Sequence, residues 1–193
     1  MDPQLRFTLL YQRHYGSVMR YATRRTDPDT ARDVVAETFL VAWRRLEAVP
    51  DGAAEAEPWL YAVARRVLAN AERSRRRADR VTARLGNQRP DAALAADPAD
   101  AVTERARVEQ ALRALSEADR EALRLVGWEE LDLAGAALAM GCSRAAMAVR
   151  LHRARRRLAR VLESREQGAD TAPAMPAGSG HDHRFAVSRE ELP

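Results

Sequence analysis

Arginine side chains gathered on predicted helices are the groups of this sequence best suited to chemistry, and that chemistry is the binding of phosphate. Residues 58–80 hold seven arginines and two acids, and residues 144–165 hold eight arginines and one acid. All 32 basic residues of the 193-residue chain are arginine, and its formal net charge is +4. Because clustered guanidinium groups neutralise phosphates, the two segments indicate contacts with nucleic acid.

The first basic segment is predicted to form a helix that begins at Pro58 and carries its charges on one side. Asn70 lies among the arginines, and an amide can read a base edge where a guanidinium mostly contacts the backbone. Trp59 and Tyr61 could stack on unpaired bases, although Trp59 could equally be a core residue. The charged side comprises Arg66, Asn70, Arg73, Arg77 and Arg80, opposite the apolar residues Leu60, Val63, Ala64, Val67 and Ala71.

The second basic segment has the pattern of a helix-turn-helix, a motif whose second helix enters the major groove. Asp132 is suited to cap a short helix over 133–140, Gly141 to end it, and Ser143 to cap a longer helix. Gly135 is unfavourable inside the short helix, by about 0.8–1.0 kcal/mol relative to alanine. A helical hairpin with no DNA role is the alternative. The longer helix has an inward stripe of Met147, Leu151, Ala154, Leu158 and Val161 and an outer surface with Arg144, Ala148, His152, Arg153, Arg155, Arg156 and Arg157.

A third segment, residues 27–57, is acidic, with eight acids and three arginines. Asp29, Asp33 and Glu37 lie four residues apart on one face of a predicted helix, where each like-charged pair costs roughly 0.2–0.5 kcal/mol. A cationic partner surface would offset this repulsion, and a solvated face is the alternative. The helix is predicted to begin after an Asp27 cap, to run to about Leu46, and to bury Val35, Phe39, Ala42, Trp43 and Leu46.

The remaining residues give little support to an enzyme, a metal protein or a membrane protein. The sequence shows no nucleophile–base set and no glycine-rich phosphate loop, so we expect neither catalysis nor a cofactor. His181-Asp182-His183 lies in a Gly/Pro-rich tail and is a weak metal signal. The lone Cys142 is expected to be a small buried hydrophobe in a cytoplasmic protein. We find no membrane-spanning segment and no secretory signal.

The elements that must position these residues are helices. Helical periodicity without alternating strand patterns predicts an all-α fold of two small helical domains joined by a flexible linker. The domains are placed at residues 5–80 and 104–164 by changes in composition. The linker would occupy residues 81–103, and residues 165–193 would form a disordered tail.

Three motifs, in this order and with this spacing, are similar to those of a known family. Residues 33–43 read Asp-Val-Val-Ala-Glu-Thr-Phe-Leu-Val-Ala-Trp, and residues 58–65 read Pro-Trp-Leu-Tyr-Ala-Val-Ala-Arg. Residues 115–155 begin with Leu-Ser and end with Arg-Leu-His-Arg-Ala-Arg. They resemble, in turn, the core-polymerase-binding helix, the −10-element helix and the −35-reading domain of extracytoplasmic-function (ECF) sigma factors of the sigma-70 family. The two sigma domains would be the bundle at 5–80 and the helix-turn-helix domain at 104–164.

The resemblance implies a factor that binds core RNA polymerase and directs initiation at promoters. The acidic helix would bind the clamp of the largest polymerase subunit, the second domain would contact the flap, and an anti-sigma factor is a possible partner. The −10 strand would be captured after melting. The implied residues are Asp33, Glu37, Phe39 and Trp43 for polymerase, Trp59, Tyr61, Arg66, Asn70, Arg73 and Arg77 for −10 DNA, and Arg144, Ala148, Val149, Arg150, His152, Arg153 and Arg156 for −35 DNA.

A stand-alone helix-turn-helix transcriptional regulator is the alternative function. It would account for the second basic segment but leaves the acidic helix and the helix with Asn70 without a purpose. Such a regulator would bind its operator alone, whereas a sigma factor needs core polymerase for specific binding. The family motif is also altered here, because Met147-Ala148-Val149 replaces a more polar run and predicts a less polar reading of −35 DNA.

Overall fold

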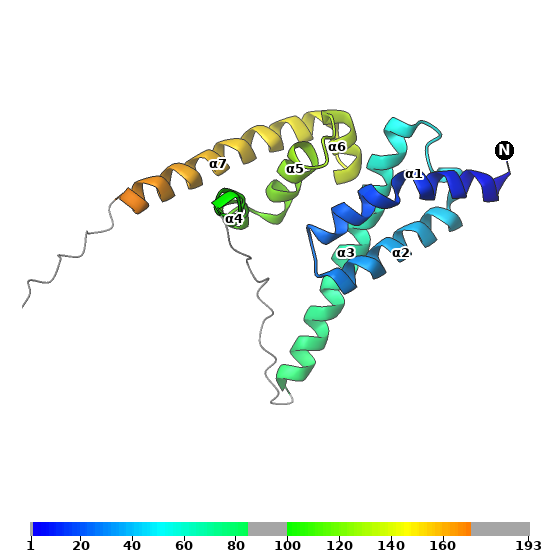
Figure 1. Cartoon of the computed structure of the whole chain (residues 1–193), viewed down its shortest axis with the longest axis horizontal. Helices are drawn as coiled ribbons and strands as arrows, with labels where there is room; N and C mark the ends of the chain where they lie inside the picture. The colour runs from blue at the N-terminus through cyan, green and yellow to red at the C-terminus, as the bar shows by residue number, and fades with distance from the viewer. Residues whose placement is uncertain (1, 85–99, 171–193) are drawn as a thin grey trace, which may run out of the picture.

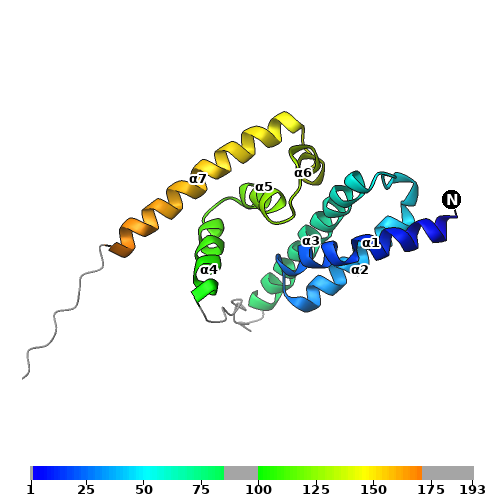
Figure 2. The ribbon, with the colours of Figure 1, turned by 45° about the horizontal axis from the view of Figure 1, so that its top comes forward.

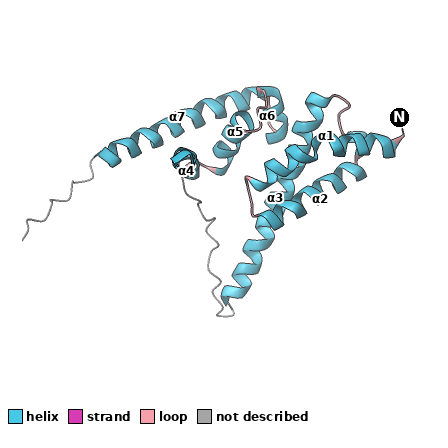
Figure 3. Ribbon diagram, viewed as in Figure 1, coloured by secondary structure: helices cyan, strands magenta, loops and turns pink. Residues whose placement is uncertain are grey.

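The computed structural model describes residues 2–84 and 100–170, and every regular element within these ranges is a helix. Figure 3 shows the same: ribbon helices joined by short loops. The expected all-α class is therefore confirmed. The elements are α1 (Pro3–Thr23), α2 (Pro28–Arg44), the short 3-10 helix η1 (Leu46–Ala48), α3 (Ala53–Arg84), α4 (Asp100–Arg113), α5 (Glu117–Gly127), α6 (Leu133–Met140) and α7 (Arg144–Asp170).

The first three helices pack on one another as an N-terminal unit, and α4 to α7 form a C-terminal unit (Figure 1). The N-terminal unit is held by apolar side chains that face inward from all three helices. Each of these helices repeats its apolar positions at three- and four-residue spacing, which places them on one face. The buried set includes Val18, Tyr21 and Ala22 of α1, Val34, Val35 and Phe39 of α2, and Leu60 and Ala64 of α3.

The helix ends follow the expected local signals. The Asp27 carboxylate accepts a hydrogen bond from the Thr30 backbone N–H at 2.9 Å, and that bond is the main reason why the pKa of Asp27 falls to about 2. Asp132 caps α6 by accepting from the Gly135 N–H at 2.7 Å. Gly141 ends α6 with φ of 66°, and Ser143 caps α7 through the Ala146 N–H.

The start of α3 differs from the prediction, because the helix begins at Ala53 and carries Pro58 inside it. The Gly52 carbonyl accepts hydrogen bonds from the N–H groups of Glu55 and Ala56, at 3.1 and 2.9 Å, and so opens the helix one turn earlier. Pro58 has no N–H and removes one hydrogen bond of the helix. Its ring is fully buried, and apolar packing offsets that loss.

Trp43 was predicted to be a core residue of α2, and this is wrong. Its side chain is 43% exposed, whereas Val35, Phe39 and Ala42 are buried as expected. The indole packs edge-on against Phe7 of α1, with ring centres 5.1 Å apart, so α1 covers one side of it. The apolar period of α2 places Trp43 on the inner face but does not reveal how far α1 extends over it.

The helices also extend into both segments expected to be irregular. The predicted linker at 81–103 overlaps α3, which continues to Arg84, and α4, which starts at Asp100. The predicted tail at 165–193 overlaps α7, which continues to Asp170. Residues 85–99 and 171–193, and with them the His181-Asp182-His183 motif, lie outside the described residues.

The two units touch. Figures 1 and 2 both place α6 beside the N-terminal half of α3, and this is the densest contact between the units. The end of α1 meets α5 and the loop that follows it. Part of the surface of each unit is therefore covered by the other unit.

Candidate nucleic-acid interface

The outer face of α7, defined here as Arg144, Ala148, Val149, His152, Arg153 and Arg156, is exposed along its whole length. Met147, Leu151 and Ala154 point the other way and are buried. Because these inward residues recur at helical spacing, they fix the rotation of α7 and leave the outer face in solvent. The second helix of a helix-turn-helix presents such a face to the major groove.

Arg150 is the exception among the residues predicted to contact −35 DNA. It is only half-buried, and its Nε atom is buried without a hydrogen-bond partner in the described part of the chain. Its position at the edge of the outer face suits a phosphate contact better than a base contact, since the side chain has to emerge from beside the core.

The basic stripe of α3, defined here as Arg66, Asn70, Arg73 and Arg77, is exposed throughout. Arg73 donates a hydrogen bond to the Asn70 side-chain oxygen. Arg75 and Arg76, which widen the stripe in the sequence, are instead paired with Glu72 at 2.6 and 2.7 Å. The stripe therefore keeps three cationic groups and one amide on a single side of the helix.

The two aromatic residues at the start of α3 lie in the interior rather than on the stripe. Trp59 is half-buried and packs against the hydrophobic core. Tyr61 is 2% exposed and stacks on Tyr21, with ring centres 4.7 Å apart and planes at 18°. Burial, followed by the nearby Glu57 carboxylate, raises the pKa of Tyr61 above its ordinary value. Tyr61 therefore presents no open face to a base, and Trp59 is only partly exposed.

The acidic face of α2, defined here as Asp29, Asp33 and Glu37, is exposed. Asp29 pairs with Arg32 at 2.9 Å, and both side chains remain largely in solvent. Phe39, predicted to contact polymerase, is instead a core residue with 3% exposure. Its ring centre lies 4.8 Å from that of Tyr11, so Phe39 supports the exposed Tyr11 ring from the core.

An exposed aromatic patch adjoins the acidic face, and apart from Trp43 its members were missed from the sequence. It consists of Tyr11 and Tyr15 of α1 and Leu40 and Trp43 of α2, each about 40% exposed. Phe7, Tyr11 and Tyr15 recur every four residues, which was the available signal for a shared face on α1. An apolar patch bordered by carboxylates is suited to a protein partner with both apolar and cationic groups.

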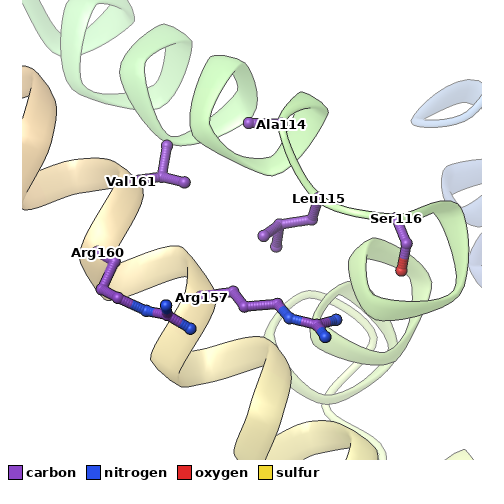
Figure 4. Close-up of a pocket in the computed structure, with 6 residues that line it drawn as sticks. All are labelled: Ala114, Leu115, Ser116, Arg157, Arg160 and Val161. Carbon is purple, nitrogen blue, oxygen red and sulfur yellow. The ribbon is translucent and has the colours of Figure 1, made fainter.

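Neither a catalytic nor a metal site emerges from the described residues. Within them, no cluster of three His, Cys, Asp or Glu side chains could hold a metal ion. A shallow pocket between the α4–α5 turn and α7 is shown in Figure 4, where Arg157 and Arg160 face Leu115 and Ser116. The guanidinium of Arg157 is already paired with the buried Asp119, and the residues that line this pocket include no histidine, cysteine or carboxylate.

Comparison with known proteins assigns both units. The sigma-70 region 2 model matches residues 10–78, and the sigma-70 region 4 model matches residues 105–158. The ECF RNA polymerase sigma factor SigL of Mycobacterium tuberculosis is 32% identical over 155 residues, which cover 80% of this chain and 87% of SigL. The chain belongs to the ECF sigma factors of the sigma-70 family. It is thus a transcription-initiation factor that works with core RNA polymerase and promoter DNA.

Solved structures agree with this sigma-factor fold. The sigma factor RpoE from Bartonella quintana, solved with the anti-sigma factor NepR, has a TM-score of 0.62 and 24% identity, covering 81% of this chain and 96% of RpoE. CnrH, solved with the cytosolic domain of CnrY, has a TM-score of 0.56 and 25% identity, covering 82% of this chain and 88% of CnrH. Region 2 of this sigma factor spans α1 to α3, region 4 ends inside α7, and α7 continues for a further twelve residues. None of the described helices is long and apolar enough to cross a membrane.

Proposed function

We propose that this sigma factor reads the −35 element with the outer face of α7 and the −10 element with the basic stripe of α3. The observation that carries the proposal is the presence of two exposed, arginine-rich helix faces on separate units of one chain. Arg153 and His152 would approach base edges, and Arg144 and Arg156 would contact phosphates. Ala148 and Val149 would supply apolar contacts, such as those made to the methyl group of thymine.

Sequence-specific reading of the −10 element would depend on Asn70, whose amide can contact a base edge. The three arginines around it are suited to contact the phosphates of the strand. Bases of the melted strand would be held beside this stripe, and their capture offsets unstacking costs of a few kcal/mol. Trp59 and Tyr61 are the weaker candidates for stacking, since Tyr61 is buried against Tyr21 of the same unit and Trp59 is only partly exposed.

Docking on polymerase is proposed for the acidic face of α2 together with the aromatic patch. Asp33 and Glu37 supply charge, and Trp43 supplies apolar area beside them. A cationic, partly apolar surface such as the clamp of the largest polymerase subunit would satisfy both, and region 4 would contact the flap. An anti-sigma factor is a further proposed partner, since RpoE from Bartonella quintana, which shares this fold, was solved with the anti-sigma factor NepR.

Run-off transcription with purified core polymerase tests the proposal. The sigma factor should yield a promoter-specific transcript, and core polymerase without it should not. A gel shift distinguishes the sigma factor from the rival function. A stand-alone regulator would bind its DNA site without polymerase, whereas the sigma factor should bind specifically only with polymerase. Specific binding by the chain alone, with no transcript in the presence of core polymerase, would favour the regulator.

A further inference from the structure

One large apolar side chain of α7 lies in solvent, on the outer face of the helix. Val149 is 50% exposed, whereas Met147, Leu151 and Ala154 of the same helix are buried. A β-branched residue is a slightly poorer helix former than alanine, and Val149 lies outside the hydrophobic core. The side chain therefore contributes little to the fold and is free to contact whatever the outer face binds.

The surroundings of Val149 on α7 are small and apolar. After Arg144, the next exposed residues carry no polar side-chain group: they are Ala145, Ala146, Ala148 and Val149. Exposed polar groups return one turn later, at His152 and Arg153. Small side chains let a helix approach base edges closely, and an apolar side chain in the major groove is suited to an apolar group of a base rather than to a hydrogen bond.

The direction of Val149 is fixed by the way α7 is held. Ser143 caps the helix by accepting a hydrogen bond from the Ala146 N–H at 3.2 Å, and Arg157 pairs with Asp119 of α5. Valine in a helix has one strongly preferred χ1 rotamer, so its two methyl groups are in place before binding. Little side-chain entropy is therefore lost when Val149 is buried against a base.

From this arrangement we infer that Val149 is a specificity-determining residue, which reads a C5-methyl group on a pyrimidine of the −35 element. The inference rests on the proposed function, because it needs α7 to be the helix that enters the major groove. Thymine carries this methyl group, and it is the apolar group that a base pair presents in the major groove. 5-Methylcytosine presents a methyl group at the same place, so the chemistry that Val149 recognises is the methyl group at C5.

The spacing along α7 places this methyl group relative to the base that Arg153 faces. Val149 and Arg153 are about one turn apart on the same side of the helix, which is about 6 Å along its axis. Stacked bases are about 3.4 Å apart along DNA, so a helix lying along the groove would bring the two residues to positions roughly two base pairs apart. The −35 element should therefore hold a methyl-bearing pyrimidine about two base pairs from the position that Arg153 contacts.

DNA suits this part of α7 better than a protein partner does. Val149 is bordered by alanines, which add little apolar area, and beyond them by the exposed cations Arg144, Arg153 and Arg156. The aromatic patch of region 2 offers four large exposed side chains and is the better apolar surface for a protein. A small apolar centre within a cationic border matches the base edges and flanking phosphates of one groove.

Removal of single methyl groups from the promoter tests the inference. The holoenzyme, made from the full chain and core polymerase, is first footprinted on a promoter that it transcribes, which locates the −35 element. Each thymine of that element, on either strand, is then replaced in turn by deoxyuridine, which lacks the methyl group and keeps the hydrogen-bonding groups. At fixed salt, one such replacement should weaken holoenzyme binding about fourfold, the effect of losing one buried methyl group.

Val149→Ala completes a cycle between protein and DNA. The variant should bind the unmodified promoter about fourfold more weakly than the parent, and the deoxyuridine that weakens the parent should have no further effect on it. Leu138→Ala is the matched control, because Leu138 is 43% exposed on α6, outside the outer face. That variant should respond to deoxyuridine as the parent does. Alanine is favourable in a helix, so neither substitution should unfold region 4.

Cytosine methylation separates the methyl group from the rest of thymine. At the position that responds to deoxyuridine, the thymine pair is replaced by a cytosine–guanine pair with or without a methyl group at C5 of cytosine. A preference of the parent for the methylated pair, absent in Val149→Ala, supports recognition of the methyl group alone. A response to deoxyuridine without a response to cytosine methylation supports Val149 as a reader of thymine.

The outcomes also separate this inference from the proposed function. If Arg153→Ala weakens binding but Val149→Ala leaves every deoxyuridine effect unchanged, α7 remains the reader and the role of Val149 is overturned. Weaker binding of Val149→Ala to core polymerase without DNA would overturn it as well, because the side chain would then contact a protein. If the holoenzyme forms no promoter-specific complex, the proposed function and this inference both fail.

Discussion

Arg157, on the exposed side of α7, reaches back to the buried carboxylate of Asp119 on α5 and forms an ion pair with it. This pair ties the helix proposed to read DNA to the body of region 4. Asp119→Asn should lower the free energy of unfolding by about 1 kcal/mol, at the low end for a charge-assisted bond because Arg157 is half exposed. Urea denaturation measures the effect, and Glu117→Gln, an exposed change in the same turn, should leave it unchanged.

Charge on the acidic face of α2 should govern docking on polymerase. Glu37→Lys introduces the wrong sign at the middle of that face and should weaken association with core polymerase about tenfold while leaving the fold intact. Glu47→Lys is the control, because Glu47 is exposed on η1, outside the face. Equilibrium binding to core polymerase distinguishes them, and equal affinities for both variants would refute the role of the acidic face.

Arg153 should contribute to DNA binding from the centre of the outer face of α7. Arg153→Ala should cost about 1–3 kcal/mol if its contact is to a base, and it should reduce the salt dependence of binding by about one phosphate if its contact is to the backbone. Arg13→Ala is the control, since Arg13 is exposed on α1 and lies outside both faces proposed to contact DNA. Footprinting of the holoenzyme at several salt concentrations measures both effects. Identical footprints for Arg153→Ala and the parent would count against α7 as the reader.

The stability of region 2 should depend on pH through His14. This side chain is 5% exposed, and burial lowers its pKa below the ordinary value of 6.5. A histidine with a lowered pKa in the folded chain contributes fully above about pH 6.5, and its contribution declines as the pH falls toward the lowered value. Urea midpoints at pH 7.5 and pH 5.5 should therefore differ more for the parent than for His14→Gln. An equal difference in both proteins would show that other groups cause the pH dependence.

Much of the fold could be predicted because its signals are local. Asp27, Asp132 and Gly141 act within one turn of their own helix ends, so their roles follow from residue type and position. The outer face of α7 is also local, since the inward apolar residues determine which side is left in solvent. Family motifs then supplied the assignment of the two regions.

Contacts between distant segments could not be predicted in this way. Arg25 and Glu129 are 104 residues apart, and nothing near either residue indicates its partner. From the sequence, Gly135 is only a poor helix former. Its structural role depends on Pro58 of α3, which lies so close that a Cβ atom at Gly135 would be crowded. The exposure of Trp43 was misjudged for the same reason: helical periodicity gives the direction of a side chain but not what covers it.

The pairing of Arg25 with two carboxylates makes the halves of the chain a matched set rather than exchangeable modules. A chimera could keep residues 2–84 and take its C-terminal half from a relative without acids at the places of Glu121 and Glu129. The buried guanidinium of Arg25 would then have no carboxylate partner between the two units. Such a hybrid would keep both helix faces proposed to contact DNA and yet lose this contact between its units. Engineers who recombine these factors to build orthogonal genetic circuits would therefore have to transfer Glu121 and Glu129 together with α7.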